Sequence, residues 1–128
     1  VALHGAPGDA AGLAFAVEPL ARVGAVVLTV EAPFARRDPA RPLAYAPQDS
    51  ADLVQYVADA RGALALLAAR PDVDAGRLAA FGLSYGGMAG AALVAAEPRL
   101  RAAVLAVADD GLAARHTADD GRRWPAPP

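Results

Sequence analysis

The chain contains four short apolar runs, and each is predicted to be a β-strand or the end of one. They are Val1–Leu3, Ala25–Val30, Leu78–Leu83 and Ala102–Val107. The longer segments between them carry helical spacing and loop residues. Strands that alternate with helices predict a parallel sheet, because a parallel crossover needs room for a helix. We therefore expect an α/β fold, with a parallel sheet of about four strands and helices on both faces.

The clearest helix lies in the middle of the chain. Its apolar residues recur at the helical period: Leu53, Val57, Ala60, Leu64 and Leu67. Ser50 is a candidate N-cap for this helix, and Pro71 is expected to end it. A second helix is expected around Leu13–Leu20, with Asp9 as a candidate cap. Pro19 lies within that stretch, so we expect this helix to be split or to start late.

A third helix is expected over Met88–Ala96. The segment Glu31–Asp49 holds four prolines and predicts a long irregular loop, which makes it a candidate to shape a substrate site. Its charged residues, Arg36, Arg37, Asp38 and Arg41, are either contacts for an acidic substrate or ordinary solvated side chains.

Composition excludes several classes of protein. The chain has 128 residues, a net charge of −2 and no basic patch, so we expect no nucleic-acid partner. Cysteine is absent and only His4 and His116 are histidines, so we expect no metal and no cofactor. No apolar run is long enough to span a membrane. The oligomeric state and the localisation stay open, with the cytoplasm as default.

The two ends suggest an incomplete domain. The chain opens on VALHG without methionine and closes on RRWPAPP. We expect residues 1–128 to be part of a single domain truncated at both ends, with 108–128 an irregular tail that leads toward missing strands.

The stretch FGLSYGGMAG carries the main functional signal. Ser84 stands directly between the predicted strand and the predicted helix, with Gly82 and Gly86 two residues away on either side. This is the G-x-S-x-G pattern in the strand–turn–helix context of a nucleophile elbow, in which side chains at the glycine positions would clash. Serine is also a favoured helix N-cap, so a purely structural role is the alternative. A phosphate-binding loop is excluded because it needs a lysine, and the chain has none.

Two segments resemble a known family. LHGAPGD resembles the His-Gly loop of the α/β-hydrolase superfamily, and PDVDAGRLAAFGLSYGG resembles the approach to its elbow. The match runs from Val1 to about Val107 and is greatest for the dienelactone-hydrolase and acetylxylan-esterase-like branch. It implies a partial α/β-hydrolase fold with the strands in the spatial order Ala25–Val30, Val1–Leu3, Leu78–Leu83, Ala102–Val107.

The resemblance also assigns roles. Ser84 would be the nucleophile, and the backbone N–H groups of Tyr85 and Ala6 would form the oxyanion hole. Gly82, Gly86 and Gly87 would support the elbow, while His4 and Gly5 would hold the loop rather than act as base. The Tyr85 ring is expected either to pack or to bring its hydroxyl to the substrate.

The implied activity is hydrolysis of a small carboxylic ester or acyl substrate through an acyl-enzyme. A peptidase or thioesterase of the same fold and a non-catalytic binding protein are the alternatives. The family places its acid and base after two further strands, downstream of Pro128. A local set of Asp109 or Asp110 with His116 has the right order, but these residues are read as solvated surface by default.

Overall fold

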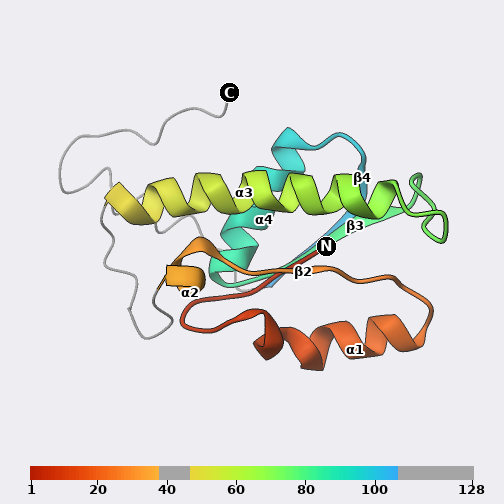
Figure 1. The fold of residues 1–128 in the computed structure, drawn as a ribbon, viewed down its shortest axis with the longest axis horizontal. Coiled ribbons are helices and arrows are strands. Elements are labelled where there is room, and N and C mark those ends of the chain that lie inside the picture. The colour runs from red at the N-terminus through yellow and green to blue at the C-terminus, as the bar shows by residue number, and fades with distance from the viewer. Residues whose placement is uncertain (38–46, 107–128) are drawn as a thin grey trace.

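A computed structural model describes residues 1–37 and 47–106, and four parallel strands form its centre (Figure 1). The strands are β1 (Ala2–Leu3), β2 (Thr29–Val30), β3 (Leu78–Leu83) and β4 (Leu100–Ala106). Their spatial order is β2-β1-β3-β4. The predicted α/β class, the number of strands and the strand order are confirmed.

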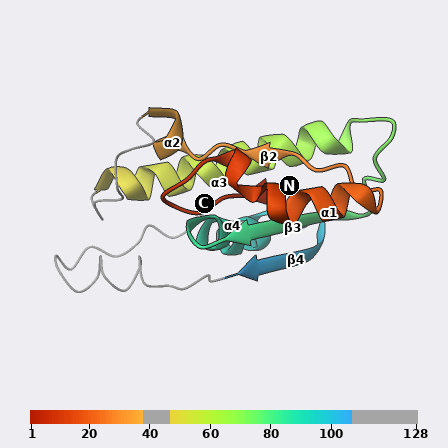
Figure 2. The same ribbon diagram turned by 90° about the horizontal axis from the view of Figure 1, so that it is seen from below.

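The helices lie on both faces of this sheet. On one face, a 3₁₀ turn (Ala10–Leu13) leads into α1 (Ala14–Arg22); on the other lie α3 (Pro47–Ala68) and α4 (Tyr85–Ala96). Figure 2 shows α1 in front of the strands and α4 behind β3. A fourth, short helix, α2 (Pro33–Arg37), follows β2.

The core lies between the sheet and the two helices α3 and α4. One face of α3 is buried at helical spacing: Leu53, Tyr56, Ala60, Ala63, Leu64 and Leu67. Leu3 of β1 and Leu93 of α4 are both fully buried in the same cluster. Each such leucine stabilises the fold by about 1.5–3 kcal/mol relative to an exposed one. This packing holds the start of α4 against the ends of β1 and β3.

The predicted strand Ala25–Val30 is largely wrong. Only Thr29 and Val30 are strand, and the side chain of Val26 is 42% exposed. In the described part of the chain, β2 lies at one edge of the sheet and pairs with β1 alone, although α3 and the 3₁₀ turn also contact it. The other edge strand, β4, is also exposed at residues 101–104. β4 is therefore much less buried than the central strands β1 and β3.

One loop prediction and two helix predictions also need correction. The segment Glu31–Asp49 is not wholly irregular, because it contains α2 and the first turn of α3. Helix α3 begins at Pro47, so Ser50 lies inside its first turn and is not the cap; proline suits the first position because its missing N–H would be unpaired there anyway. The split near α1 falls at Leu13, since Asp9 caps the preceding 3₁₀ turn, and Pro19 lies within α1.

Candidate active site

Ser84 is the single residue that joins β3 to α4, and its backbone is strained. Its φ is 53° and its ψ is −117°, and it is the one non-glycine residue with positive φ in the described ranges. Its N–H donates to the carbonyl of Ala106 at 2.8 Å, and its carbonyl accepts from the N–H of Gly87 at 2.7 Å. Such a conformation costs about 1–3 kcal/mol and persists only where its surroundings impose it.

The Ser84 hydroxyl does not serve the helix that follows it. Ser84 occupies the N-cap position of α4, yet its side chain makes no capping hydrogen bond. The side chain is also only partly buried. The side-chain oxygen of a serine placed there only to cap the helix would accept a hydrogen bond from an N–H group of the first turn. Within the described residues, the geometry of Ser84 is therefore not explained by helix capping.

The positions of Gly82 and Gly86 beside Ser84 have no room for a side chain. A β-carbon on Gly82 would stand 2.4 Å from the carbonyl oxygen of Gly86 and 2.9 Å from the α-carbon of Gly87. A β-carbon on Gly86 would stand 2.1 Å from the carbonyl oxygen of Leu3. Both contacts are with backbone, which cannot move aside as a flexible side chain could. The elbow therefore tolerates no side chain at Gly82 or Gly86.

The His-Gly loop lies beside the elbow. Because β1 pairs with β3 in parallel, with Leu3 opposite Gly82, the residues that follow each strand meet at the carboxyl end of the sheet. A β-carbon on Gly5 would stand 3.0 Å from that of Ser84. The structure thus brings Gly5 and the loop that contains Ala6 next to Ser84.

The start of α4 supplies a second feature of this site. Tyr85 is the first helical residue, so its N–H has no acceptor within the helix. The helix dipole places partial positive charge at the same end. An oxyanion that forms on a carbonyl attacked by Ser84 would be stabilised there.

His4 is buried, with 2% of its surface exposed, and both of its ring nitrogens are engaged. Nδ1 lies 2.8 Å from the carbonyl oxygen of Gly5, and Nε2 accepts from the N–H of Ala32 at 2.9 Å. Its backbone N–H donates to the Tyr56 hydroxyl at 2.7 Å. His4 therefore ties three segments together and is not placed as a base for Ser84.

The Tyr85 side chain packs in the core, and the hypothesis that its hydroxyl reaches the substrate is wrong. The ring is 2% exposed, stacks on Tyr56 at 6.0 Å and meets the edge of Phe34 at 5.5 Å. Its hydroxyl donates to the carbonyl of Asp49 at 3.3 Å. Burial raises the pKa of both tyrosines above the ordinary value, so both stay protonated.

Two of the loop arginines are paired with carboxylates. Arg36 donates to Asp59 at 2.6 Å, and Arg37 donates to both oxygens of Asp52. They lie beside a surface cavity of about 340 Å³, which is also lined by Pro33, Gln48, Ala51 and Gln55. Because each guanidinium already has an anion, this pairing favours a structural role over binding of an acidic substrate.

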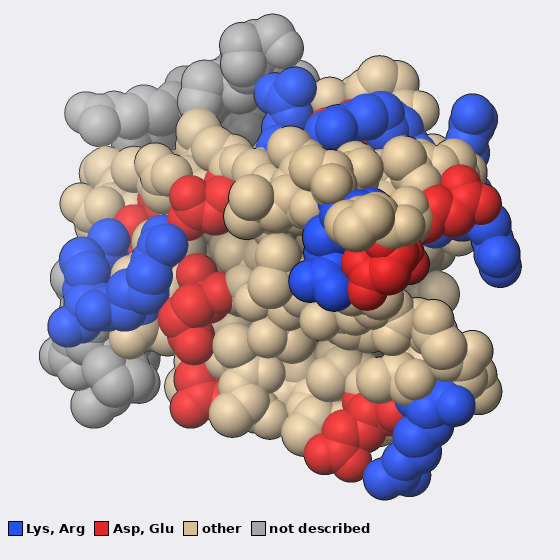
Figure 3. All heavy atoms as spheres, turned by 45° about the vertical axis from the view of Figure 1, so that its right-hand side comes forward, with Lys and Arg blue, Asp and Glu red and all other residues tan. Residues whose placement is uncertain are grey.

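Charges of both signs are mixed over the surface as well. Figure 3 shows basic and acidic side chains side by side on one face, with uncharged surface between them.

Several predicted residues lie outside the described residues. They are Asp38, Arg41, Asp109, Asp110 and His116. The local acid–base set is therefore still a prediction.

The sequence reasoning missed Glu31 and Tyr56. Glu31 follows β2 directly, and its carboxylate lies 2.8 Å from His4 Nε2. One signal could have pointed to it, because residues that follow neighbouring parallel strands meet at the same edge of the sheet. Tyr56 carries no such signal, since it lies on the buried face of α3 like an ordinary core residue.

No family model, curated protein or solved structure matches the chain. Residues 1–37 and 47–106 contain no cluster of acidic, histidine or cysteine side chains that could hold a metal ion. Within the same residues, no helix combines the length and the apolar character that crossing a bilayer requires.

Proposed function

We propose that this chain carries the nucleophile of a serine hydrolase of the α/β-hydrolase type, which acts on carboxylic esters through an acyl-enzyme. One observation carries the proposal: Ser84 is held in a strained conformation between β3 and α4, with a hydroxyl that caps nothing. Backbone strain of this kind persists only where the surrounding structure maintains it, and such positions cluster at active sites.

In the proposed reaction, Ser84 Oγ attacks the ester carbonyl carbon and loses its proton to a histidine. The carbonyl oxygen becomes an oxyanion, and the N–H groups of Tyr85 and Ala6 donate to it. Collapse of this intermediate breaks the bond to the alcohol, which leaves with the proton from the histidine. Water then attacks the acyl-enzyme by the same route and releases the acid.

The base in this scheme is not His4, because both nitrogens of its ring are engaged in holding the loop. His116 is the other histidine of the chain. The base is therefore either His116, with Asp109 or Asp110 as its partner, or a residue outside this sequence. A serine hydroxyl without a base is a poor nucleophile at neutral pH.

The experiment is labelling with a fluorophosphonate probe, followed by mass spectrometry of the modified peptide. The chain has two serines, Ser50 and Ser84, which gives a matched control. We expect the probe on Ser84, loss of labelling in Ser84→Ala, and full labelling in Ser50→Ala. Absence of labelling in a folded protein that contains its histidine base would reject the proposal in favour of a non-catalytic role.

An ester hydrolysis assay then identifies the base. If His116→Ala abolishes turnover in the 128-residue chain, the local set is complete. If the chain alone shows only trace turnover, the base lies elsewhere.

A further inference from the structure

Four buried aromatic side chains from four segments of the chain form a closed cluster beside the candidate active site: His4, Phe34, Tyr56 and Tyr85. His4 lies 5.7 Å from Phe34 and 5.9 Å from Tyr56, measured between ring centroids. Tyr85 lies 5.5 Å from Phe34 and 6.0 Å from Tyr56. These distances are typical of favourable aromatic pairs. Phe34 and Tyr56 therefore act as spacers between His4 and Tyr85.

His4 and Tyr85 belong to the two segments that carry the proposed oxyanion donors. His4 follows β1 and begins the loop whose Ala6 N–H is one donor, and the N–H of Tyr85, the first residue of α4, is the other. Both donors have to lie about 2.7–3.1 Å from the same oxygen. The separation between the loop and α4 therefore decides whether the hole can form.

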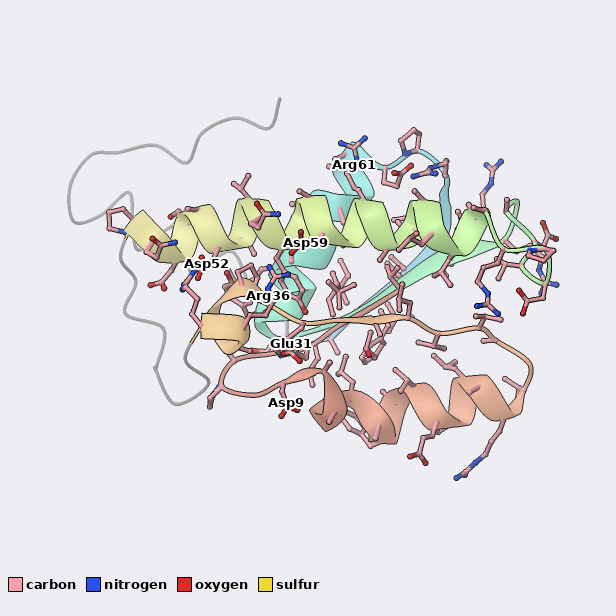
Figure 4. The ribbon with its side chains drawn as sticks, viewed as in Figure 1. Asp9, Glu31, Arg36, Asp52, Asp59 and Arg61 are labelled. Carbon is pink, nitrogen blue, oxygen red and sulfur yellow. The ribbon has the colours of Figure 1, made fainter. Side chains whose placement is uncertain are left out.

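Phe34 is held in place from both ends of α2. Just before the helix, the N–H of Ala32 donates to Nε2 of His4 at 2.9 Å. At the last two residues of the helix, two arginine–carboxylate pairs fasten α2 to α3: Arg36–Asp59 and Arg37–Asp52. Figure 4 shows the first of these pairs between the two helices. The Phe34 side chain has no polar group, so it contributes to the cluster through its ring alone.

We propose that Phe34 is a positioning residue for the oxyanion hole, because its ring sets the separation at which the N–H groups of Ala6 and Tyr85 reach one oxygen. This role rests on the proposed function. Removal of the ring would leave a cavity that the surrounding residues fill only in part, so the loop and α4 would shift relative to each other. A shift of about 1 Å can lower a rate about 100-fold even where the substitution lies away from the reacting atoms.

Leu67 offers a matched control for a cavity in the same core. Phe34 and Leu67 are both 5% exposed and belong to one hydrophobic cluster. Leu67 lies eleven positions after Tyr56 in α3, which is about 16 Å along the helix axis. Leu67→Ala should therefore lower stability without changing the aromatic cluster, and urea denaturation compares its loss of stability with that of Phe34→Ala.

Crystal structures of the variants test the separation without reference to activity. In Phe34→Ala, the distance between the backbone nitrogens of Ala6 and Tyr85 should change by about 0.5 Å or more, which is the tolerance of a catalytic arrangement. In Leu67→Ala, this distance should match the wild-type value within coordinate error. An unchanged distance in Phe34→Ala would overturn the proposal. If Phe34→Ala does not fold, Phe34→Leu, which also lacks the ring, takes its place under the same criteria.

Kinetics of the protein that labels on Ser84 test the positioning role. We expect Phe34→Ala to lower kcat about tenfold or more and to change KM by less than about threefold, because the oxyanion contact is made in the transition state. Leu67→Ala should keep kcat within about threefold of the wild-type value. Equal losses of kcat in Phe34→Ala and Leu67→Ala, or an unchanged kcat in both, would overturn the role. If Ser84 does not label at all in a protein that contains its base, the proposed function fails instead, and the crystal structures still report on the separation.

Discussion

Gly86 lies directly against Leu3, and a β-carbon on Gly86 would stand 2.1 Å from the Leu3 carbonyl oxygen. This contact sets the distance between the first turn of α4 and the end of β1. It also places the elbow beside the His-Gly loop, since Leu3 immediately precedes His4. The geometry around Ser84 therefore depends on a residue 83 positions away from Gly86.

The first prediction concerns Gly86. Gly86→Ala should lower the free energy of unfolding by about 3 kcal/mol, because the added methyl group meets backbone that must be displaced. Gly62, on the exposed side of α3, has no atom within 4 Å of the position of a β-carbon, and Gly62→Ala should stabilise by about 1 kcal/mol. Urea denaturation measures both. A neutral Gly86→Ala would show that the close approach is not required.

The second prediction concerns the strain at Ser84. Its positive φ favours glycine, so Ser84→Gly should be more stable than Ser84→Ala by about 1–2 kcal/mol. This difference is the strain that glycine relieves, reduced by the larger backbone entropy that glycine loses on folding. Ser50 lies in α3, where the order should reverse and alanine should be better by about 1 kcal/mol. Thermal and urea unfolding of the four variants checks this. Equal stability of the two Ser84 variants would argue against a strained elbow.

The third prediction concerns the hydroxyl of Tyr56. Tyr56→Phe leaves the buried N–H of His4 without its acceptor and should cost about 1–3 kcal/mol of stability. Tyr85→Phe is the matched control, because the carbonyl of Asp49 also accepts within α3, and its cost should be about 1 kcal/mol or less. Denaturant unfolding of the two variants decides. A smaller loss for Tyr56→Phe than for Tyr85→Phe would contradict the assigned hydrogen bond.

The fourth prediction concerns pH and Glu97, which ends α4. Hydrogen bonds from Arg99 lower the pKa of Glu97 from 4.5 to about 2, and Arg61 lies 3.7 Å away. Because the folded-state pKa is lowered, the ionised carboxylate stabilises the fold above about pH 4.5, and this contribution is lost as pH falls toward 2. Glu97→Gln should therefore destabilise the protein at pH 7.

The difference between Glu97→Gln and the wild-type protein should shrink as the pH of the unfolding measurement falls from 5 to 3. Asp72→Asn is the control, since the Asp72–Arg70 pair is exposed and should contribute little. A difference that stays constant over this pH range would mean that the Glu97 carboxylate does not titrate as its contacts imply.

Local patterns predicted the elements well where the determinants are close in sequence. The buried face of α3 follows from apolar spacing, and the turn at Ser84 follows from glycines two residues away on either side. The start of α3 was misplaced because Pro47 and Ser50 both suit a helix N-terminus. The extent of β2 was overestimated because β-branched residues favour strand whether or not a partner strand and a covering helix are present.

The amino-acid sequence by itself determined the alternation of strands and helices and the position of Ser84 between them, since both depend on neighbours a few residues apart. Only the tertiary structure decided what surrounds that serine. His4 meets Tyr56 across 52 positions and Ala32 across 28, and the Tyr85 hydroxyl meets the Asp49 carbonyl across 36. Such contacts form when packing brings distant segments together, so no local spacing encodes them, and the two made by His4 hold the start of the proposed oxyanion loop.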